Sequence, residues 1–322
     1  MKRKLIYLGI VLAVALGVLI VERPDLGLQG DADFEPLVVD YDSGGVTNIR
    51  VNQLLSGVQV KKEAGKWMVA DMPTPLREKL GQQVAGESGT NWFVADPQVV
   101  KRALSGLVNV QKGIVASMNP DNQVAYQVAG PIGLHVVLEN KDGTLADIII
   151  GKTSPDHSGS YVRMQGSDEV YLVNKTLTGL FPTALTDWRD RTIWNVEPQK
   201  IRTISVSTPK DSYEIVKQKN AWAVIGKPDT KLDSATVSEL LGKLSDMRAR
   251  GFAVSSDPRA AFKKPELTVG LALDDGKVET LEVAGTNNLG QSYARRKGDD
   301  QVYLVNSPDS LVPTNLDELK NK

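Results

Sequence analysis

The chain has 322 residues, of which 41% are hydrophobic and 24% are charged, a composition typical of a folded protein long enough for two domains. There are 38 basic and 39 acidic residues and no basic block to neutralise a run of phosphates, so nucleic acid is not an expected partner. With no cysteine and two histidines, the composition also excludes disulfides, thiol nucleophiles and a transition-metal site.

The N-terminus carries basic residues at positions 2–4, followed by an uncharged apolar run from 5 to 21. As a helix this run would be about 26 Å long, close to the thickness of a bilayer core. We therefore expect a single transmembrane helix as a membrane anchor over residues 1–23, followed by a linker over 24–44. The positive-inside rule keeps the basic residues in the cytoplasm and the bulk of the chain outside. A cleaved signal peptide is the alternative, although no small-x-small cleavage site follows Val21.

The rest of the chain contains an internal repeat. The segment VYLVN occurs at 170–174 and again at 302–306, and its surroundings match as well: GSYVR (159–163) with QSYAR (291–295), LFPT (180–183) with LVPT (311–314), and Trp67 with Trp222. Each copy has short strands, a helix that begins after an aspartate, and hairpins at Asp-Gly turns. The sequence therefore predicts an α+β fold, with two tandem homologous repeats of antiparallel sheet and one main helix each.

The predicted boundaries follow from the alignment of the two copies. The first repeat spans 45–187 and carries an insertion at 74–91, the second spans 199–322, and the joint between them is 188–198. Since the insertion has no counterpart in the second repeat, we expect it to leave the surface of the first.

Each sequence that suggests catalysis has a simpler interpretation. The GKT at 151–153 lacks the glycine that a phosphate-binding loop needs five residues before Gly151. The letters of a hydrolase triad at 156–158 are consecutive and cannot adopt triad geometry. Acidic pairs at 168–169 and 299–300 lie at hairpin turns, where carboxylates are normally solvated. We therefore expect a non-enzymatic protein with no catalytic residue, no cofactor and no metal.

Two groups of residues remain as candidate interaction sites: Trp188, Arg189, Asp190, Arg191 and Trp194 in the joint, and Trp92 and Phe93 at the end of the insertion. Exposed tryptophan and arginine are enriched in protein contacts, which favours a binding role. In the alternative, the indoles are buried between the repeats and Arg–Asp pairs cover them. Exposure of the two indoles distinguishes these interpretations.

Together, a tryptophan after two short strands, a proline, an Asp-capped helix, a tyrosine-centred strand pair and the joint WRDRTIW (188–194) resemble the bacterial family called domain of unknown function 4340. The resemblance covers nearly all of the chain after about residue 40. It implies a membrane-anchored envelope protein whose gene often lies beside an ABC-type transport system of the gliding-motility kind. The implied location is the bacterial inner membrane, single-pass, with the C-terminal bulk in the periplasm. The implied partners are inner-membrane ABC transporter subunits.

Three functions follow as hypotheses. The first is a membrane-anchored periplasmic protein that serves as an accessory or scaffold subunit of an ABC-type transport or envelope assembly system. The second is a periplasmic ligand-binding module that holds a glycan or a lipid in a cleft between the repeats. The third is an envelope hydrolase.

Overall fold

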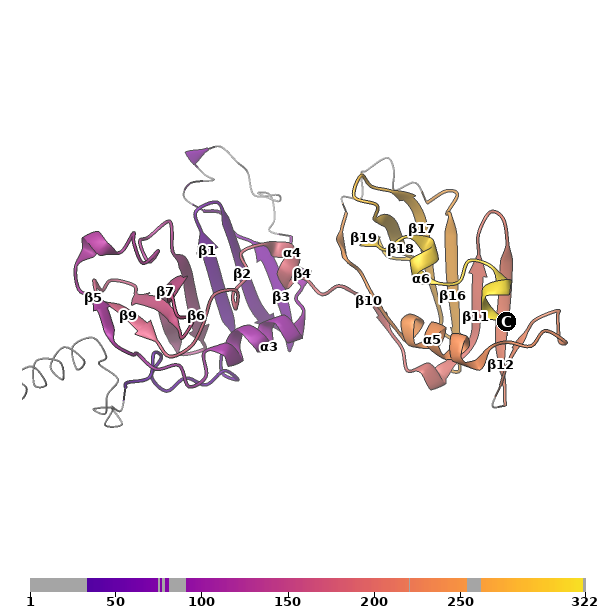
Figure 1. Cartoon of the computed structure of the whole chain (residues 1–322), viewed down its shortest axis with the longest axis horizontal. Coiled ribbons are helices and arrows are strands. Elements are labelled where there is room, and N and C mark those ends of the chain that lie inside the picture. Colours follow the sequence, from indigo (N-terminus) through magenta and orange to yellow (C-terminus); the bar gives the residue numbers. More distant parts are fainter. Residues whose placement is uncertain are drawn as a thin grey trace, which may run out of the picture. The chain divides into compact units, whose positions relative to one another are not determined.

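The computed structural model describes residues 34–74, 76, 79–80, 91–219, 221–253 and 262–320 (Figure 1). By its contacts the chain divides into two compact units, which we call the first and the second unit. The first unit is Met1–Leu54 with Ala103–Phe181, and the second is Leu55–Arg102 with Pro182–Lys322. The predicted repeat boundaries stay a prediction.

The larger sheet has nine strands in the order β4-β3-β2-β1-β6-β7-β8-β9-β5. Its strands are β1 (Asn48–Gln53), β2 (Ser56–Glu63), β3 (Lys66–Asp71), β4 (Phe93–Val94), β5 (Val115–Ser117), β6 (Leu134–Asn140), β7 (Gly143–Thr153), β8 (Ser160–Met164) and β9 (Val170–Val173). Strand alternation determines which side chains reach the core: Ile49 and Val51 are buried, and Arg50 between them is not. The predicted hairpin at Asp142 is present, and the Asn140 side chain accepts the two backbone N–H groups of its turn.

A second sheet has eight strands in the order β13-β12-β11-β16-β17-β18-β19-β15. Its strands are β11 (Ile201–Ser207), β12 (Ser212–Gln218), β13 (Ala221–Val224), β15 (Gly251–Phe252), β16 (Leu267–Leu273), β17 (Val278–Thr286), β18 (Ser292–Arg296) and β19 (Val302–Val305). A separate pair joins β10 (Thr192–Asn195) to β14 (Asp246–Arg248). Apart from β4, the nine-stranded sheet has the same order of corresponding strands as this one.

In the part of the chain that the structure describes, the helices are few and short. The two longer ones are α3 (Pro97–Gly106) and α5 (Ser234–Ser245). The helices α4 (Leu185–Trp188) and α6 (Pro308–Leu311) have four residues each, and the 3-10 turns are η1 (Pro120–Asn122), η2 (Pro198–Lys200) and η3 (Leu316–Leu319). As predicted, Asp233 caps α5, because its carboxylate accepts the backbone N–H of Thr236 at 2.7 Å. Leucines and a valine at helical spacing on α5, Val237, Leu240 and Leu244, are buried in the core of the second sheet.

The α+β prediction is wrong, because the described chain is mostly antiparallel β-sheet, arranged in three sheets. Strands of two or three residues, such as β4, β5 and β15, are too short to show an alternating pattern and exist because a neighbouring strand pairs with them. They extend the sheets, while each large sheet keeps one longer helix.

The predicted N-terminal anchor, residues 1–23, lies outside the described residues. Within the described ranges, no helix is both long and apolar enough to cross a bilayer.

Candidate functional site

Both joint tryptophans have their indoles in the protein interior. Trp188 is fully buried at the end of α4 and donates from Nε1 to the carbonyl of Pro182 at 2.6 Å. Trp194 on β10 is 4% exposed and donates from Nε1 to the carbonyl of Leu244 at 2.7 Å. Since buried indoles do not meet a partner directly, the burial of these two indoles argues against direct contact with a partner, and their predicted position between the repeats stays a prediction.

The charged residues of the joint mostly bond to nearby groups of the second unit. The guanidinium of Arg189 lies over the rings of Phe93 and Phe252, 3.7 and 3.5 Å from their centroids, and donates to Gln301 at 2.6 Å. Burial lowers the pKa of Arg189 to about 10, so it stays charged at neutral pH.

The remaining joint residues have short-range partners. Asp190 accepts the backbone N–H of Thr192 at 2.9 Å, and Arg191 pairs with Asp187 at 3.2 Å. These contacts stabilise the turn into β10, and the partner-binding role of the joint stays a prediction.

Trp92 and Phe93 are half-buried beside β3. The ammonium of Lys61 lies 4.1 Å from the centroid of a Trp92 ring. Most of the predicted insertion lies outside the described residues, at 75, 77–78 and 81–90. The structure brings Phe93, and not Trp92, onto Arg189 of the joint.

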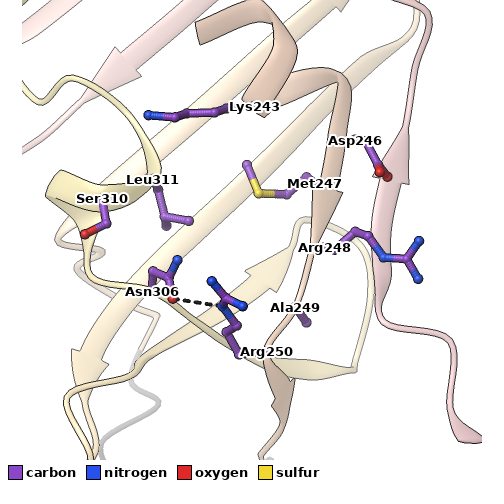
Figure 2. A pocket seen from close by; sticks show the side chains of 9 residues that line it. All are labelled: Lys243, Asp246, Met247, Arg248, Ala249, Arg250, Asn306, Ser310 and Leu311. Atoms are coloured by element: carbon purple, nitrogen blue, oxygen red, sulfur yellow. Dashed lines mark hydrogen bonds between the residues drawn. The ribbon is translucent and has the colours of Figure 1, made fainter. Parts of the chain in front are cut away.

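A hollow of about 350 Å³ lies beside the C-terminal end of α5, within the second unit (Figure 2). Its apolar floor is formed by Met247, Ala249 and Leu311, all of which are buried. Its charged and polar lining consists of Lys243, Asp246, Arg248, Arg250, Asn306 and Ser310. We call this the basic hollow, because three of its four charged residues are cations.

Alternation along the chain after α5 produces this lining. Met247 and Ala249 point into the core, and therefore Asp246, Arg248 and Arg250 point outward. Arg250 donates from Nε to the Asn306 side chain at 3.1 Å, and Figure 2 shows these two side chains facing each other, while Arg248 and Asp246 point to another side.

The cations differ in their partners. Lys243 pairs with Glu239 at 2.8 Å, and Arg248 pairs with Asp96 at 2.9 Å. Within the described ranges Arg250 has no acidic partner, and its side chain bonds to Asn306. The hollow therefore presents one guanidinium whose charge the surrounding described residues do not neutralise.

In the nine-stranded sheet, the three positions that correspond to these cations carry none, although Lys112 lies between two of them and pairs with Glu35. The strand pairing shows which positions correspond. Gln111 pairs with Pro36, and Arg248 pairs with Thr192 in the second unit. In the same way, Val115 pairs with Tyr171, and Phe252 pairs with Tyr303. At this offset of 137 residues, the positions of Lys243, Arg248 and Arg250 are occupied by Gly106, Gln111 and Gly113. The asparagine that Arg250 contacts is present in both, as Asn174 and Asn306 of VYLVN. The shared fold therefore does not require these three cations.

The basic hollow was not among the residues predicted from sequence. A signal for it exists, because the alignment of 95–107 with 232–244 places Lys243 against Gly106, and the run RAR at 248–250 follows directly. What the sequence lacks is any indication that Asn306 closes the same hollow.

Comparison with protein families decides the relationship of the chain. The model of the family described as "Domain of unknown function (DUF4340)" matches residues 83–263, which is 181 of 322 residues. The chain belongs to the DUF4340 family. The matched region contains α3, the joint, α5 and all three cations of the basic hollow. No curated protein and no solved structure matched this DUF4340 chain.

Proposed function

We propose that this DUF4340 protein is a non-catalytic binding component of the bacterial cell envelope, which docks onto membrane subunits of an ABC-type transport system. The observation that carries the proposal is a run of exposed apolar side chains at one end of the nine-stranded sheet. Ile114, Val115, Met118 and Val124 are 62%, 43%, 66% and 59% exposed, within and around strand β5.

The position of β5 suits it for docking. It is the last strand of the sheet and has β9 as its neighbour, with Val115 opposite Tyr171 and Ser117 opposite Val170. End strands present backbone groups to an added strand, and natural proteins usually protect them with charged side chains or proline. Residues 114–118 contain no charge and no proline, which favours a strand-like apolar segment of a partner.

The exposed residues around β5 do not bear on the envelope location or on the class of partner, and each of these has its own support. The basic residues at 2–4 and the apolar residues at 5–21 support attachment to the membrane with the bulk of the chain outside. The ABC transporter subunits are proposed because the family resemblance implies them.

The test is a mild-detergent pull-down of the full-length chain from its own membranes, with permease and ATPase subunits quantified by mass spectrometry. The variant carries Ile114→Gln and Met118→Gln, which replace exposed apolar groups with polar ones. We expect recovery of these subunits to fall by about fivefold or more, because apolar anchors supply much of the binding free energy of an interface.

Leu289→Gln is the matched control, because Leu289 is 84% exposed in the turn between β17 and β18. It should leave recovery unchanged. Equal recovery of transporter subunits by the β5 variant and the control would contradict this docking site. If the wild-type chain recovered no transporter subunits, the proposed partner would be wrong.

A further inference from the structure

We propose that the basic hollow of the second unit binds a single carboxylate from an acidic segment of a partner protein, with Arg250 as the main contact. The inference does not depend on the β5 docking site or on the identity of the transport system, because it concerns other residues and is tested with a defined peptide.

The first step of the argument is that Arg250 has spare hydrogen-bond donors. Its Nε is used by Asn306 at 3.1 Å, and that bond orients the planar guanidinium. An arginine side chain has five N–H donors, and among the described residues only the Nε donor of Arg250 is used, so its terminal nitrogens have no acceptor in that part of the chain. A guanidinium fork matches the two oxygens of a carboxylate better than an ammonium does.

The second step is that the cations are additions to a fold that forms without them. In the nine-stranded sheet, a Cβ at Gly106 would overlap the side chain of Leu180, and one at Gly113 would overlap the carbonyl of Leu172. There the corresponding surface has no room for the side chains that form the hollow. Lys243 alone has a simple structural role, because a cation in the last turn of α5 interacts favourably with the helix dipole. Arg250 lies beyond the helix and has no such explanation.

The third step concerns the charge of the ligand. Lys243 and Arg248 already have carboxylate partners, and Asp246 adds a negative charge to the lining. The C-terminal end of α5 is also the negative end of the helix dipole, which opposes an anion. This balance favours a single negative charge over a phosphate dianion. The floor beneath the site, formed by Met247, Ala249 and Leu311, is apolar and adds no charge.

The experiment uses the purified full-length chain and a short peptide that alternates leucine and glutamate. The peptide is blocked at both ends and labelled with an uncharged fluorophore, and binding is followed by fluorescence anisotropy. A peptide with glutamine in place of glutamate is the neutral probe. We expect the acidic peptide to bind about tenfold or more tightly than the neutral one, and its affinity to fall with salt.

Arg250→Gln should reduce the affinity for the acidic peptide about tenfold, because it removes the charge and keeps an amide. Arg250→Lys should give an intermediate loss, since the charge remains and the planar fork does not. The control is Arg202→Gln, which makes the same change in charge at an exposed arginine that pairs with Asp274 at 3.6 Å. This control should bind like the wild type.

The loss of the Asn306 bond could also disturb the local fold. The variant Arg248→Gln keeps the Arg250–Asn306 bond and introduces glutamine, the residue at the corresponding position 111. It should reduce the affinity for the acidic peptide less than Arg250→Gln does. Equal binding of acidic and neutral peptides by the wild type would overturn the proposal. The proposal would also be overturned if Arg250→Gln bound the acidic peptide as tightly as the wild type. It would be overturned too if the wild type bound inorganic phosphate, or vesicles with an anionic lipid, in preference to the peptide.

Discussion

Two charged side chains are buried in the described chain, Arg163 and Glu279, and hydrogen bonds satisfy both. Arg163 donates to the carbonyls of Val128 and Ser167 at 3.0 and 2.9 Å. Burial of the Glu279 carboxylate opposes its charge, but hydrogen bonds and charge from Lys277 and Arg296 outweigh it and hold the pKa of Glu279 below its usual value. At the scale of single residues, ion pairing inside the second sheet is therefore a source of stability.

Replacing this carboxylate should destabilise the protein. Glu279→Gln leaves Arg296 and Lys277 without their charge partner, and we expect a loss of about 3 kcal/mol in the free energy of unfolding at pH 7, measured by urea denaturation. Glu239→Gln is the control, because the Glu239–Lys243 pair is exposed and should contribute little.

The pH dependence of this effect has a defined sign. The folded-state pKa of Glu279 is lowered, so its contribution is fully present above the unfolded pKa of about 4.3 and is lost as the pH falls through the folded pKa. The gap in stability between the wild type and Glu279→Gln should therefore narrow below about pH 4. A gap of constant size down to pH 3 would contradict the ion-pair explanation.

At the scale of elements, each of the two longer helices contains a glycine, and the surroundings of these glycines differ. Gly242 lies on the exposed side of α5, and an added Cβ there would meet no heavy atom within 4 Å. Gly106 ends α3, where an added Cβ would overlap Leu180. The first glycine is therefore a site of weak helix propensity, and the second is a site of close packing.

Gly242→Ala should raise the free energy of unfolding by about 0.5–1 kcal/mol, because alanine has the higher helix propensity and loses less backbone entropy. Gly106→Ala is the matched comparison and should lower stability, since the Leu180 side chain has to move. Thermal unfolding followed by circular dichroism measures both. A stabilised Gly106→Ala would show that the packing at the end of α3 is looser than described.

At the scale of the whole molecule, two large sheets with the same order of strands carry different surfaces. The nine-stranded sheet ends in exposed apolar residues around β5, and the basic hollow lies beside the helix of the second sheet. The two sheets therefore share a strand order but differ in the side chains on their surfaces. The proposed location outside the cytoplasm makes both surfaces available to envelope partners.

That location has its own test. In spheroplasts, protease added from outside should digest the full-length chain, and the undigested chain should stay in the membrane pellet after a high-salt wash, because the apolar residues 5–21 attach it. A cytoplasmic protein serves as the protected control. Protection until lysis would contradict the proposed orientation, and recovery of a shortened chain in the soluble fraction would support a cleaved signal instead.

Local signals in the sequence were sufficient for several features. The Asp-Gly hairpin at 142–143, the cap at Asp233 and family membership were predicted correctly, because turns and caps depend on a few neighbouring residues and the joint WRDRTIW is distinctive.

Tertiary structure alone decided the rest. The short strands β4, β5 and β15 form because a neighbour pairs with them, and this made the α+β class wrong. The burial of Trp188 depends on how α4 packs, and the basic hollow requires Asn306 to meet Arg250 across 56 residues of chain. Pairing, burial and convergence of distant residues depend on contacts between segments, and local periodicity in a sequence carries no information about which segments meet.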